Sequence, residues 1–481
     1  MSRALAASFR SLAVPNYRRY FTGQIVSLSG NWMQVVAEMW LVVKLTDSGA
    51  AVGFAAALQF LPMLLGAAWG GLLADRLPKR RLLMATQAAM AVPALVLFAL
   101  ALGGQPPLAA VLALIFVRGA INAIDNPTRQ AFIVEMVGPG RLLNAVSLNA
   151  ALVNSARVIG PAIAGVLIAT AGIAPCFALN ALTFFFMIAM LAAMDRSLLR
   201  SPEPAGRSRG QLRRALRHVR ITPDLRIPLA LMALVGTLAF NFQVVLPLLA
   251  RFTFHDQHGG IYAALTTAMG LGAVAGALAM GARARPRPSF TTAAAVALGV
   301  AMALTALAPT LGLALAALVV TGAASVAFAA SVNSSLQLSA RPRMRGRIMA
   351  LYAMVFLGST PIGGPLTGWL AGWAGPRWAL ALGAVAAVAG GLAARLAYRR
   401  AGVPLSHPAG TDGAPSPEPA GDARASSLQR RLSRPRYSRR GADDGHGTER
   451  TQRAAPATAA ARQGSRASRV RAGLARRGRT R

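Results

Sequence analysis

Hydrophobic residues occur in long runs along the chain, with short polar breaks between them. Each run approaches the ~20 apolar residues with which a helix crosses a bilayer. The runs do not alternate apolar and polar positions, and open strands cannot span lipid, so we predict a helix in every run. They lie at roughly 21–43, 51–73, 82–102, 107–124, 143–169, 174–194, 226–249, 260–281, 291–308, 311–332, 348–371 and 377–397. The pattern therefore predicts twelve transmembrane helices.

Basic residues collect in alternate breaks between these runs. If the N-terminus is cytoplasmic, the inner segments up to residue 398 hold 26 Lys and Arg residues, whereas the outer loops hold three, Lys44, Arg251 and Arg377. Cytoplasmic loops of membrane proteins carry such an excess of positive charge. We therefore expect a multi-pass protein of the cell inner (plasma) membrane, with both termini in the cytoplasm.

The composition excludes several classes of protein. Hydrophobic residues make up 54% of the 481 positions and charged residues 14%, whereas soluble domains are usually about 25% charged. An ordinary cytosolic enzyme, a fibrous protein and a fully disordered chain are therefore excluded. The single Cys176 excludes an internal disulfide and a cysteine-based metal site. Neither a P-loop nor a histidine–carboxylate cluster is visible, so we expect no enzyme activity, no metal and no cofactor.

The polar segment 195–225 divides the predicted helices into two groups of six. Gly160-Pro161 lies 19 residues after Arg141, and Gly364-Pro365 lies 19 residues after Arg345. Such a correspondence indicates a duplicated six-helix unit. The predicted fold class is thus an all-α membrane protein built from two pseudo-symmetric six-helix bundles. Repeats of this kind place a substrate site near the bilayer midplane and expose it alternately to either side.

The chain divides into five segments. Residues 1–20 form a cytoplasmic N-terminal segment without the apolar core of a removable signal peptide, 21–194 the N-terminal bundle, 195–225 a cytoplasmic linker, 226–397 the C-terminal bundle and 398–481 an Arg-rich tail. The net charge is +36, and the tail has few large apolar residues, so we expect it to be disordered and cytoplasmic. Its arginines and the basic inner loops would attract anionic lipid headgroups. No nucleic-acid partner is expected, because no fold or aromatic pattern supports one.

Four motifs carry a resemblance to a known family. Gly71–Arg81, with the sequence GLLADRLPKRR, resembles the signature loop between helices two and three of the major facilitator superfamily. Ala156–Gly165 resembles the helix-five motif that this superfamily associates with exporters. Together with Asn16–Phe21 and Asp125–Gln130, these motifs resemble the branch that contains the enterobactin exporter and related efflux proteins. The resemblance covers about residues 12–397.

The sequence departs from the family pattern in two places. Pro78 stands where the loop motif has its second glycine, and Ala156 stands where the helix-five motif has its first. These differences put the local geometry of the loop in question, but not the fold.

The resemblance implies a conformational lock in the first of these motifs. Gly71 would allow close helix approach, and Asp75 with Arg76 and Arg80 would hold the outward-facing state and release it inward. The alternative is plain surface charge that follows the positive-inside pattern. Met280 replaces the acid at the matching place in the second half, so such a lock would be one-sided.

The resemblance also implies a role in export for Gly160, Pro161 and Gly165. These residues would bend helix five and thin its packing face, providing a hinge or a seal against leakage. The alternative is a kink that merely fits the bundle.

Polar residues form a stripe along the first predicted span. Ser27, Asn31, Gln34 and Glu38 are spaced by 4, 3 and 4 residues, which places them on one helix face. Such a stripe is expected to face a cavity rather than lipid. A carboxyl group in apolar surroundings can bind and release a proton near neutral pH, so we assign Glu38 to proton coupling or cation binding. It could instead be a structural partner for an arginine, or lie close to the outer surface.

The fourth span carries a second polar set, Arg118, Asn122 and Asp125. Arg118 is the most deeply placed cation and could bind an anionic substrate or tune a carboxylate, although it could also belong to a structural ion pair. We assign Asp125 to proton coupling beside Glu38. Because Arg129 follows Asp125 by one turn, the two could simply pair.

The remaining substrate-cavity candidates come from the fifth and seventh spans. Arg157 could pair with either Glu38 or Asp125. In the second half Thr321 matches Arg118 and Pro247 matches Glu38, so the matching charges are absent. Asn241 and Gln243 are the candidates there, beside Phe240, Phe242, Asn333, Ser334 and Gln337. We expect the first half to couple protons and the second half to offer an apolar surface to substrate, unless these residues only pack the core.

Together these patterns predict a secondary active transporter. The first hypothesis is a proton-driven exporter of small hydrophobic or siderophore-like molecules, a monomer whose energy source is the proton gradient. The alternatives are an importer or lipid transporter on the same fold, or a membrane scaffold that transports nothing. A scaffold would have no need for the polar stripe in the first span.

Overall fold

Helices form along every apolar run, and glycine or proline marks many of their ends. The computed structural model describes residues 9–199, 211–281, 287–341 and 344–405. The long helices of the N-terminal half are α2 (Pro15–Thr46), α3 (Gly49–Arg76), α4 (Lys79–Leu102), α5 (Leu108–Val137), α6 (Leu142–Ala171) and α7 (Ala174–Ala192). Short 3-10 turns flank them at η1 (Arg10–Ala13), η2 (Pro139–Arg141) and η3 (Arg196–Leu198). Gly138 and Gly172 follow α5 and α6 with φ of 69° and 83°, values that glycine adopts without steric cost.

The C-terminal half begins with a helix of the linker. It comprises α8 (Gln211–Ile221), α9 (Pro223–Ala239), α10 (Phe242–Leu248), the π-helical turn η4 (Leu249–Thr253), α11 (Gly260–Gly281), α12 (Pro288–Leu307), α13 (Leu311–Ser339), α14 (Arg345–Gly358), α15 (Thr360–Trp373) and α16 (Pro376–Arg400). Two predicted spans are interrupted, the seventh at Phe240–Asn241 and the eleventh at Ser359. Gly358 and Pro361 flank the second interruption and account for it, because neither favours a continuous helix.

The structure confirms the predicted all-helical fold. Within the described ranges it contains no strand, and eleven helical segments are long and apolar enough to cross a membrane. The first predicted span lies in α2, which has 32 residues and therefore the length to cross as well. It is not among the eleven because its polar stripe lowers its hydropathy. The Arg-rich tail beyond residue 405 lies outside the described residues.

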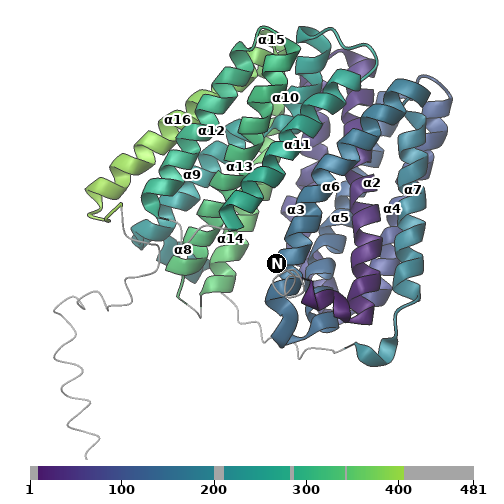
Figure 1. Cartoon of the computed structure of the whole chain (residues 1–481), viewed down its shortest axis with the longest axis horizontal. Coiled ribbons are helices and arrows are strands. Elements are labelled where there is room, and N and C mark those ends of the chain that lie inside the picture. Colours follow the sequence, from purple (N-terminus) through teal and green to yellow (C-terminus); the bar gives the residue numbers. More distant parts are fainter. Residues whose placement is uncertain (1–8, 200–210, 282–286, 342–343, 406–481) are drawn as a thin grey trace, which may run out of the picture. The chain divides into compact units, whose positions relative to one another are not determined.

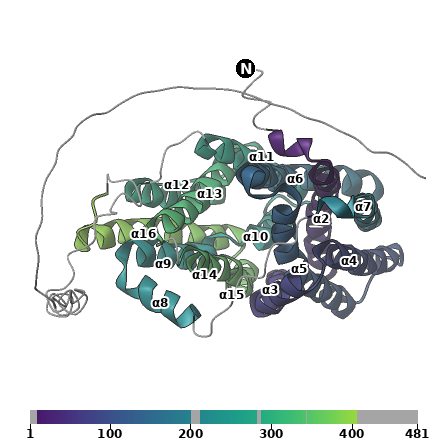
Figure 2. The same ribbon diagram turned by 90° about the horizontal axis from the view of Figure 1, so that it is seen from below.

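The helices gather into two bundles that pack against each other. Helices α2–α7 lie together on one side and α9–α16 on the other, as Figure 1 shows and the view from below in Figure 2 repeats. In the first bundle α2 packs on α6 and α7, and α3 on α5; in the second α11 packs on α13, and α12 on α16. The bundles meet chiefly where α3 lies along α15 and where α6 lies along α11. All described residues belong to one compact unit, residues 1–414.

Candidate functional site: buried polar clusters in the helical core

The first buried polar cluster joins three helices of the N-terminal bundle around Glu38. Arg118 of α5 donates from Nη2 to Glu38 Oε2 at 2.5 Å, and Gln34 donates from Nε2 to Glu38 Oε1 at 2.7 Å. Asn180 of α7 donates in turn to Gln34. Glu38 and Gln34 are fully buried, and Arg118 is 2% exposed. The Nε atom of Arg118 is buried without a hydrogen-bond partner in the described structure. The cluster is thus a buried ion pair whose cation retains one unused donor.

The second cluster surrounds Asp125, about three turns before α5 ends at Val137. Arg129 pairs with Asp125 along the same helix, as the spacing predicts. Thr86 and Gln87 of α4 donate to Asp125 Oδ1 at 2.7 and 2.9 Å. Arg129 also donates to Gln24 of α2. Asp125 therefore accepts from three side chains and lies in a fully bonded, buried network.

The polar stripe of α2 faces the interior of its own bundle. Ser27 donates to Gln87 at 3.2 Å, while Gln34 and Glu38 bond to the partners described above. Ser27, Gln34 and Glu38 of the stripe are all buried. Neighbouring side chains occupy the hydrogen-bonding positions on that face. A substrate cavity beside the stripe therefore stays a prediction, as it does for the half-buried Asn31.

The structure decides the pairing that the sequence left open for Arg157. Glu38 pairs with Arg118 and Asp125 with Arg129, whereas the Arg157 guanidinium lies over the Trp32 ring, 5.2 Å from its centroid. Its Nε atom is buried without a hydrogen-bond partner among the described residues. Arg157 is thus a cation held by an aromatic face rather than by a carboxylate. The half-buried Asn122 stands between the two α5 clusters in sequence, and its cavity role stays a prediction.

In the C-terminal half, Asn241 and Gln243 flank the interruption of span seven. Asn241 donates from Nδ2 to the Thr237 carbonyl at 2.6 Å and to Thr367 Oγ1 at 2.9 Å. The first bond satisfies an acceptor where α9 stops. The side-chain carbonyls of Asn241 and Gln243 are buried and lack donors within the described part of the chain. The interruption therefore presents two unused acceptors in the core.

An aromatic cluster surrounds the same interruption. Phe240 lies edge-on to Phe242 and Phe356, with ring centroids 6.3 and 5.8 Å away, and also contacts Phe328. Tyr352 stacks on Phe356 at 5.9 Å. The sequence pointed to Phe240 and Phe242, but not to the three aromatic residues from α13 and α14. Their spacing within apolar runs gave no sign that they would converge.

Glycines bring the two bundles into contact along α3 and α15. A Cβ atom at Gly53 would lie 3.0 Å from Pro365 Cα, and one at Gly368 would lie 2.9 Å from Gly53 Cα. Both distances are shorter than ordinary carbon contacts, so only glycine fits here. Gly49 and Gly364 belong to the same interface and give each helix two glycines spaced by four residues. This small-residue spacing is typical of close helix pairs in membranes, so the sequence could have indicated the contact between α3 and α15.

The helix-five motif contacts both bundles. Helix α6 runs without interruption through Pro161. At Gly160 a Cβ would lie 2.6 Å from the Ser29 carbonyl of α2, in the same bundle, whereas at Gly165 it would lie 2.6 Å from Ala263 Cβ of α11, in the other. The motif therefore sits in the contact between the bundles, as a hinge or seal requires. Its role in export stays a prediction.

Polar and aromatic contacts also join the two bundles at the end where α2 is followed by α3. Asp47 accepts from Arg251 Nε at 2.8 Å and from its Nη2 at 3.3 Å, which links the two halves. Trp40 stacks on Tyr262 of α11 with centroids 6.1 Å apart. We call this set, with the α3–α15 glycines, the closed end. It was not predicted, because its pairs join residues that are about 200 to 320 positions apart in the sequence.

Asp256 organises the loop that precedes α11. Its carboxylate accepts from the backbone N–H groups of His258, Gly259 and Tyr262 at 3.0, 2.8 and 3.0 Å. This carboxylate is thereby occupied as a cap for the helix start. Within the described residues, no three or more His, Cys, Asp or Glu side chains come together to hold a metal ion.

The residues of the predicted lock lie where α3 ends and α4 begins. Arg80 donates from Nε to the Leu191 carbonyl at 2.6 Å and from Nη2 to Ala192 at 2.8 Å, so it caps the end of α7. Asp75 and Arg76 are exposed in the last turn of α3, and Gly71 is half-buried. Gly70, the neighbouring residue, is the glycine that packs against Ala123 of α5. The lock itself stays a prediction.

Comparison of the chain with known proteins identifies its family. The profile of the family described as transmembrane secretion effector matches residues 6–407. The staphyloferrin A transporter of Staphylococcus aureus is 24% identical over 54% of this chain and 65% of its own length. The enterobactin exporter EntS of Citrobacter koseri is 28% identical over 55% of this chain and 62% of its own. The chain thus spans slightly less than two thirds of these two relatives.

A third relative matches over a longer stretch. The multidrug efflux pump Tap of Mycolicibacterium fortuitum is 29% identical over 72% of this chain and 87% of its own length.

Solved structures share the fold at low sequence identity. A bacterial homologue of the human lysosomal transporter Spinster, in an inward-facing and unoccupied conformation, superposes with a TM-score of 0.64 at 13% identity, covering 80% of this chain and 97% of the other. A POT family transporter in complex with a thioalcohol-conjugated peptide gives 0.65 at 12% identity, with 80% and 96% coverage. These likenesses show the fold alone. With the family match across residues 6–407, they establish that the chain belongs to the transmembrane secretion effector family of the major facilitator superfamily.

Proposed function

We propose that this protein is a secondary active exporter that moves small hydrophobic or siderophore-like molecules out of the cell in exchange for protons. Transport would proceed by alternating access between the two bundles. The positive-inside pattern supports an orientation with both termini in the cytoplasm. In that orientation the closed end faces outward, and the conformation described here is sealed on the outer side.

The buried ion pair between Glu38 and Arg118 is the observation that carries this proposal. A charged pair taken out of water is stable only while both partners are ionised and in contact. Protonation of Glu38 would remove the attraction and leave Arg118 as an uncompensated buried cation. Since Glu38 lies on α2 and Arg118 on α5, the imbalance would favour a different arrangement of these helices or the arrival of an anionic partner.

Asp125 would take a second, more static part in the coupling. It accepts from three side chains, and its arginine partner lies on the same helix. Movement between helices would therefore change its surroundings less than those of Glu38. Protonation of Asp125 would also break more bonds at once, so we assign the exchangeable proton first to Glu38.

Substrate would be bound by groups whose bonding is incomplete in the resting structure. Buried polar atoms are nearly always paired, and those without a partner are candidates for ligand contacts. Arg157, Asn241 and Gln243 each retain one such atom. The aromatic cluster around Phe240 would add an apolar surface, so the site suits a molecule with a hydrophobic body and a few anionic or hydrogen-bonding oxygen atoms.

Export rather than import is supported by what the relatives are named and by the helix-five motif. Two of the three relatives described above are named as an exporter and an efflux pump. Gly165 packs α6 closely against α11 of the other bundle. A tight contact there would restrict leakage through the sealed outer side.

The experiment is transport in proteoliposomes under an imposed pH gradient, with a panel of dyes, drugs and iron-chelating compounds. We expect a gradient that is acidic on the outer side to drive accumulation on that side. Glu38→Gln should abolish gradient-driven movement while leaving substrate exchange without a gradient. Glu135→Gln is the matched control, because Glu135 is another buried carboxylate with a cationic partner, Lys79 at 2.6 Å, outside both polar clusters. Gradient-driven transport by Glu38→Gln at the rate of this control would refute the coupling mechanism.

A further inference from the structure

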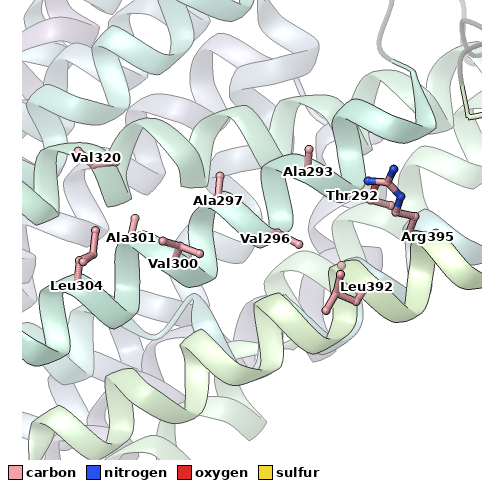
Figure 3. A pocket seen from close by; sticks show the side chains of 11 residues that line it. Thr292, Ala293, Val296, Ala297, Val300, Ala301, Leu304, Val320, Leu392 and Arg395 are labelled. Carbon is pink, nitrogen blue, oxygen red and sulfur yellow. The ribbon is translucent and has the colours of Figure 1, made fainter.

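An apolar groove runs along the outer face of the C-terminal bundle. It lies between α12 and α16, is bordered by Val320 of α13, and has a volume of about 500 Å³. The groove is well away in sequence from the polar clusters of the N-terminal bundle. Small residues contribute to its lining, among them Ala293, Ala297 and Gly391, and Figure 3 shows the groove along the two helices.

The groove faces the surface that the membrane covers. Val300, Leu304, Val320 and Leu392 line it and are each about half exposed. Large apolar side chains on the outside of a transmembrane bundle contact lipid tails rather than water. The occupant of this groove is therefore expected to come from the bilayer.

One end of the groove is cationic. Arg395 lies there beside Thr292, whereas Leu304 and Val320 lie at the far end (Figure 3). Arg395 is exposed and forms no ion pair with any residue that the structure describes. The Thr292 hydroxyl already donates to backbone carbonyls, at 3.1 Å to Pro288. Arg395 is therefore the residue at this end of the groove that would bind a headgroup.

The cationic end also lies at the membrane surface. Helix α16 ends at Arg400, five residues after Arg395, and its last turn holds Arg399 and Arg400. The chain then returns to the start of α12, where Ser289 N donates to the Leu405 carbonyl at 3.2 Å. An arginine within a turn or two of a membrane helix end reaches toward the headgroups, where it attracts anionic lipid.

The length of the groove matches one lipid chain. Thr292 and Leu304 are twelve residues apart on α12, which corresponds to about 18 Å along the helix. One leaflet of a bilayer contributes about 15 Å, half of the ~30 Å hydrocarbon core. A single acyl chain that starts at Arg395 therefore fills the groove within one leaflet.

We propose that this groove holds an anionic phospholipid, with its phosphate on Arg395 and one acyl chain along α12. The proposal requires only that the bundle is embedded in a membrane, so it stands apart from the direction or coupling of transport. The lipid would be a resident component that fills the space between α12 and α16.

Native mass spectrometry of the full chain tests this proposal. The protein is released from micelles that contain equal amounts of dioleoylphosphatidylglycerol and dioleoylphosphatidylcholine, and the retained lipids are counted. We expect the wild type to retain the anionic lipid preferentially. Arg395→Gln should reduce that retention about fivefold, the equivalent of about 1 kcal/mol for one basic residue near the membrane surface.

Two further variants separate the groove from general surface charge. Arg399→Gln is the matched control, because it removes an arginine one turn along the same helix but outside the groove, and it should retain the lipid as the wild type does. Ala297→Phe places a large side chain in the groove and should expel the lipid. If that variant folds poorly, Val300→Trp blocks the groove from its exposed rim.

Three outcomes would overturn the proposal. Equal losses in Arg395→Gln and Arg399→Gln would mean nonspecific attraction by surface charge. Equal retention of the zwitterionic and anionic lipids by the wild type would mean an apolar occupant without headgroup recognition. A dimer that disappears in Ala297→Phe would assign the groove to a second copy of the chain.

Discussion

The closed end offers a sharp test of the packing argument, because two glycines of α15 differ only in the room they leave. A Cβ atom at Gly368 would lie 2.9 Å from Gly53 Cα and 3.0 Å from Gly53 N, whereas at Gly372 the nearest atom, Gly49 N, would be 3.7 Å away. Both residues lie on α15 toward α3, one turn apart. Gly368→Ala should therefore force the helices apart, while Gly372→Ala should fit as the structure stands.

The size of the effect follows from this geometry. Carbon contacts are optimal at about 3.5–4.0 Å, so α3 and α15 must separate by roughly 0.5–1 Å in Gly368→Ala. Overpacking of this kind costs about 1–3 kcal/mol, which corresponds to a shift of about 5–150-fold away from the closed end. Both substitutions also gain about 0.5–1 kcal/mol from the higher helix propensity of alanine. Comparison of the two variants cancels that gain.

The assay is double electron–electron resonance between spin labels on the two bundles. Lys44 on α2 and Trp378 on α16 are exposed residues near the closed end and can carry the labels after replacement by Cys in a Cys176→Ser background. Gly368→Ala should increase the fraction of long distances, and Gly372→Ala should match the parent. Indistinguishable distance distributions for the two variants would refute the claim that glycine contact holds this end together.

Four further predictions follow from the charged and polar contacts. Arg118→Met should lower the free energy of unfolding by about 3–5 kcal/mol, and adding Glu38→Gln should recover much of that loss in thermal unfolding, because the single change leaves a buried charge unpaired; equal losses would argue against a coupled pair. Asp47→Asn should change that free energy by less than about 1 kcal/mol, since its ion pair is largely exposed, yet should raise the labelling rate of cysteines at the closed end. Burial and the charge of Arg341 lower the pKa of His218, so the docking of α8 should weaken as the pH falls below about 6.5, and hydrogen exchange in α8 should lose this pH dependence in His218→Gln. Asp75→Asn should preserve expression but abolish transport in the proteoliposome assay; normal rates would remove its role as a lock.

Much of the fold could be predicted because a membrane imposes simple rules on a sequence. Long apolar runs predicted the helices, and the spacing of Ser27, Asn31, Gln34 and Glu38 predicted a polar stripe on α2 that faces a cavity rather than lipid. Ser27, Gln34 and Glu38 are buried, and a cavity beside them stays a prediction. Polar groups cannot face lipid without a large cost, so helical periodicity is enough to assign the face.

The partners on that face could not be predicted in the same way. Periodicity assigns a residue to a side of its helix, but it does not set the rotation or height of the neighbouring helices. Glu38 could therefore have met Arg118 or Arg157, and only the packing of α2 against α5 decides between them. The pairing of Asp125 with Arg129 was easier to anticipate, because the two residues lie one turn apart on a single helix.

The interruption at Phe240–Asn241 is the clearest feature that the sequence concealed. The run from 226 to 249 is mostly apolar, and neither glycine nor proline stands at Ala239 or Phe240, where α9 stops. The helix can end there because Asn241 supplies a side-chain donor to a backbone carbonyl. Such a bond depends on tertiary packing around Asn241, so the single asparagine gave too weak a signal.

The N-terminal bundle is held by buried hydrogen-bonded clusters, whereas the C-terminal bundle has a cluster of aromatic rings. This difference affects which mutations each bundle tolerates. A change at Gln87 or Gln34 removes a hydrogen-bond partner from two other buried side chains, so most replacements there should be lost under selection for function. Rings such as Phe240 and Phe356 touch each other without directional bonds, and exchange among bulky apolar residues leaves no buried group stranded. Laboratory selection for new compounds should therefore accumulate its substitutions in the C-terminal half, leaving the hydrogen-bonded interior of the first half nearly invariant.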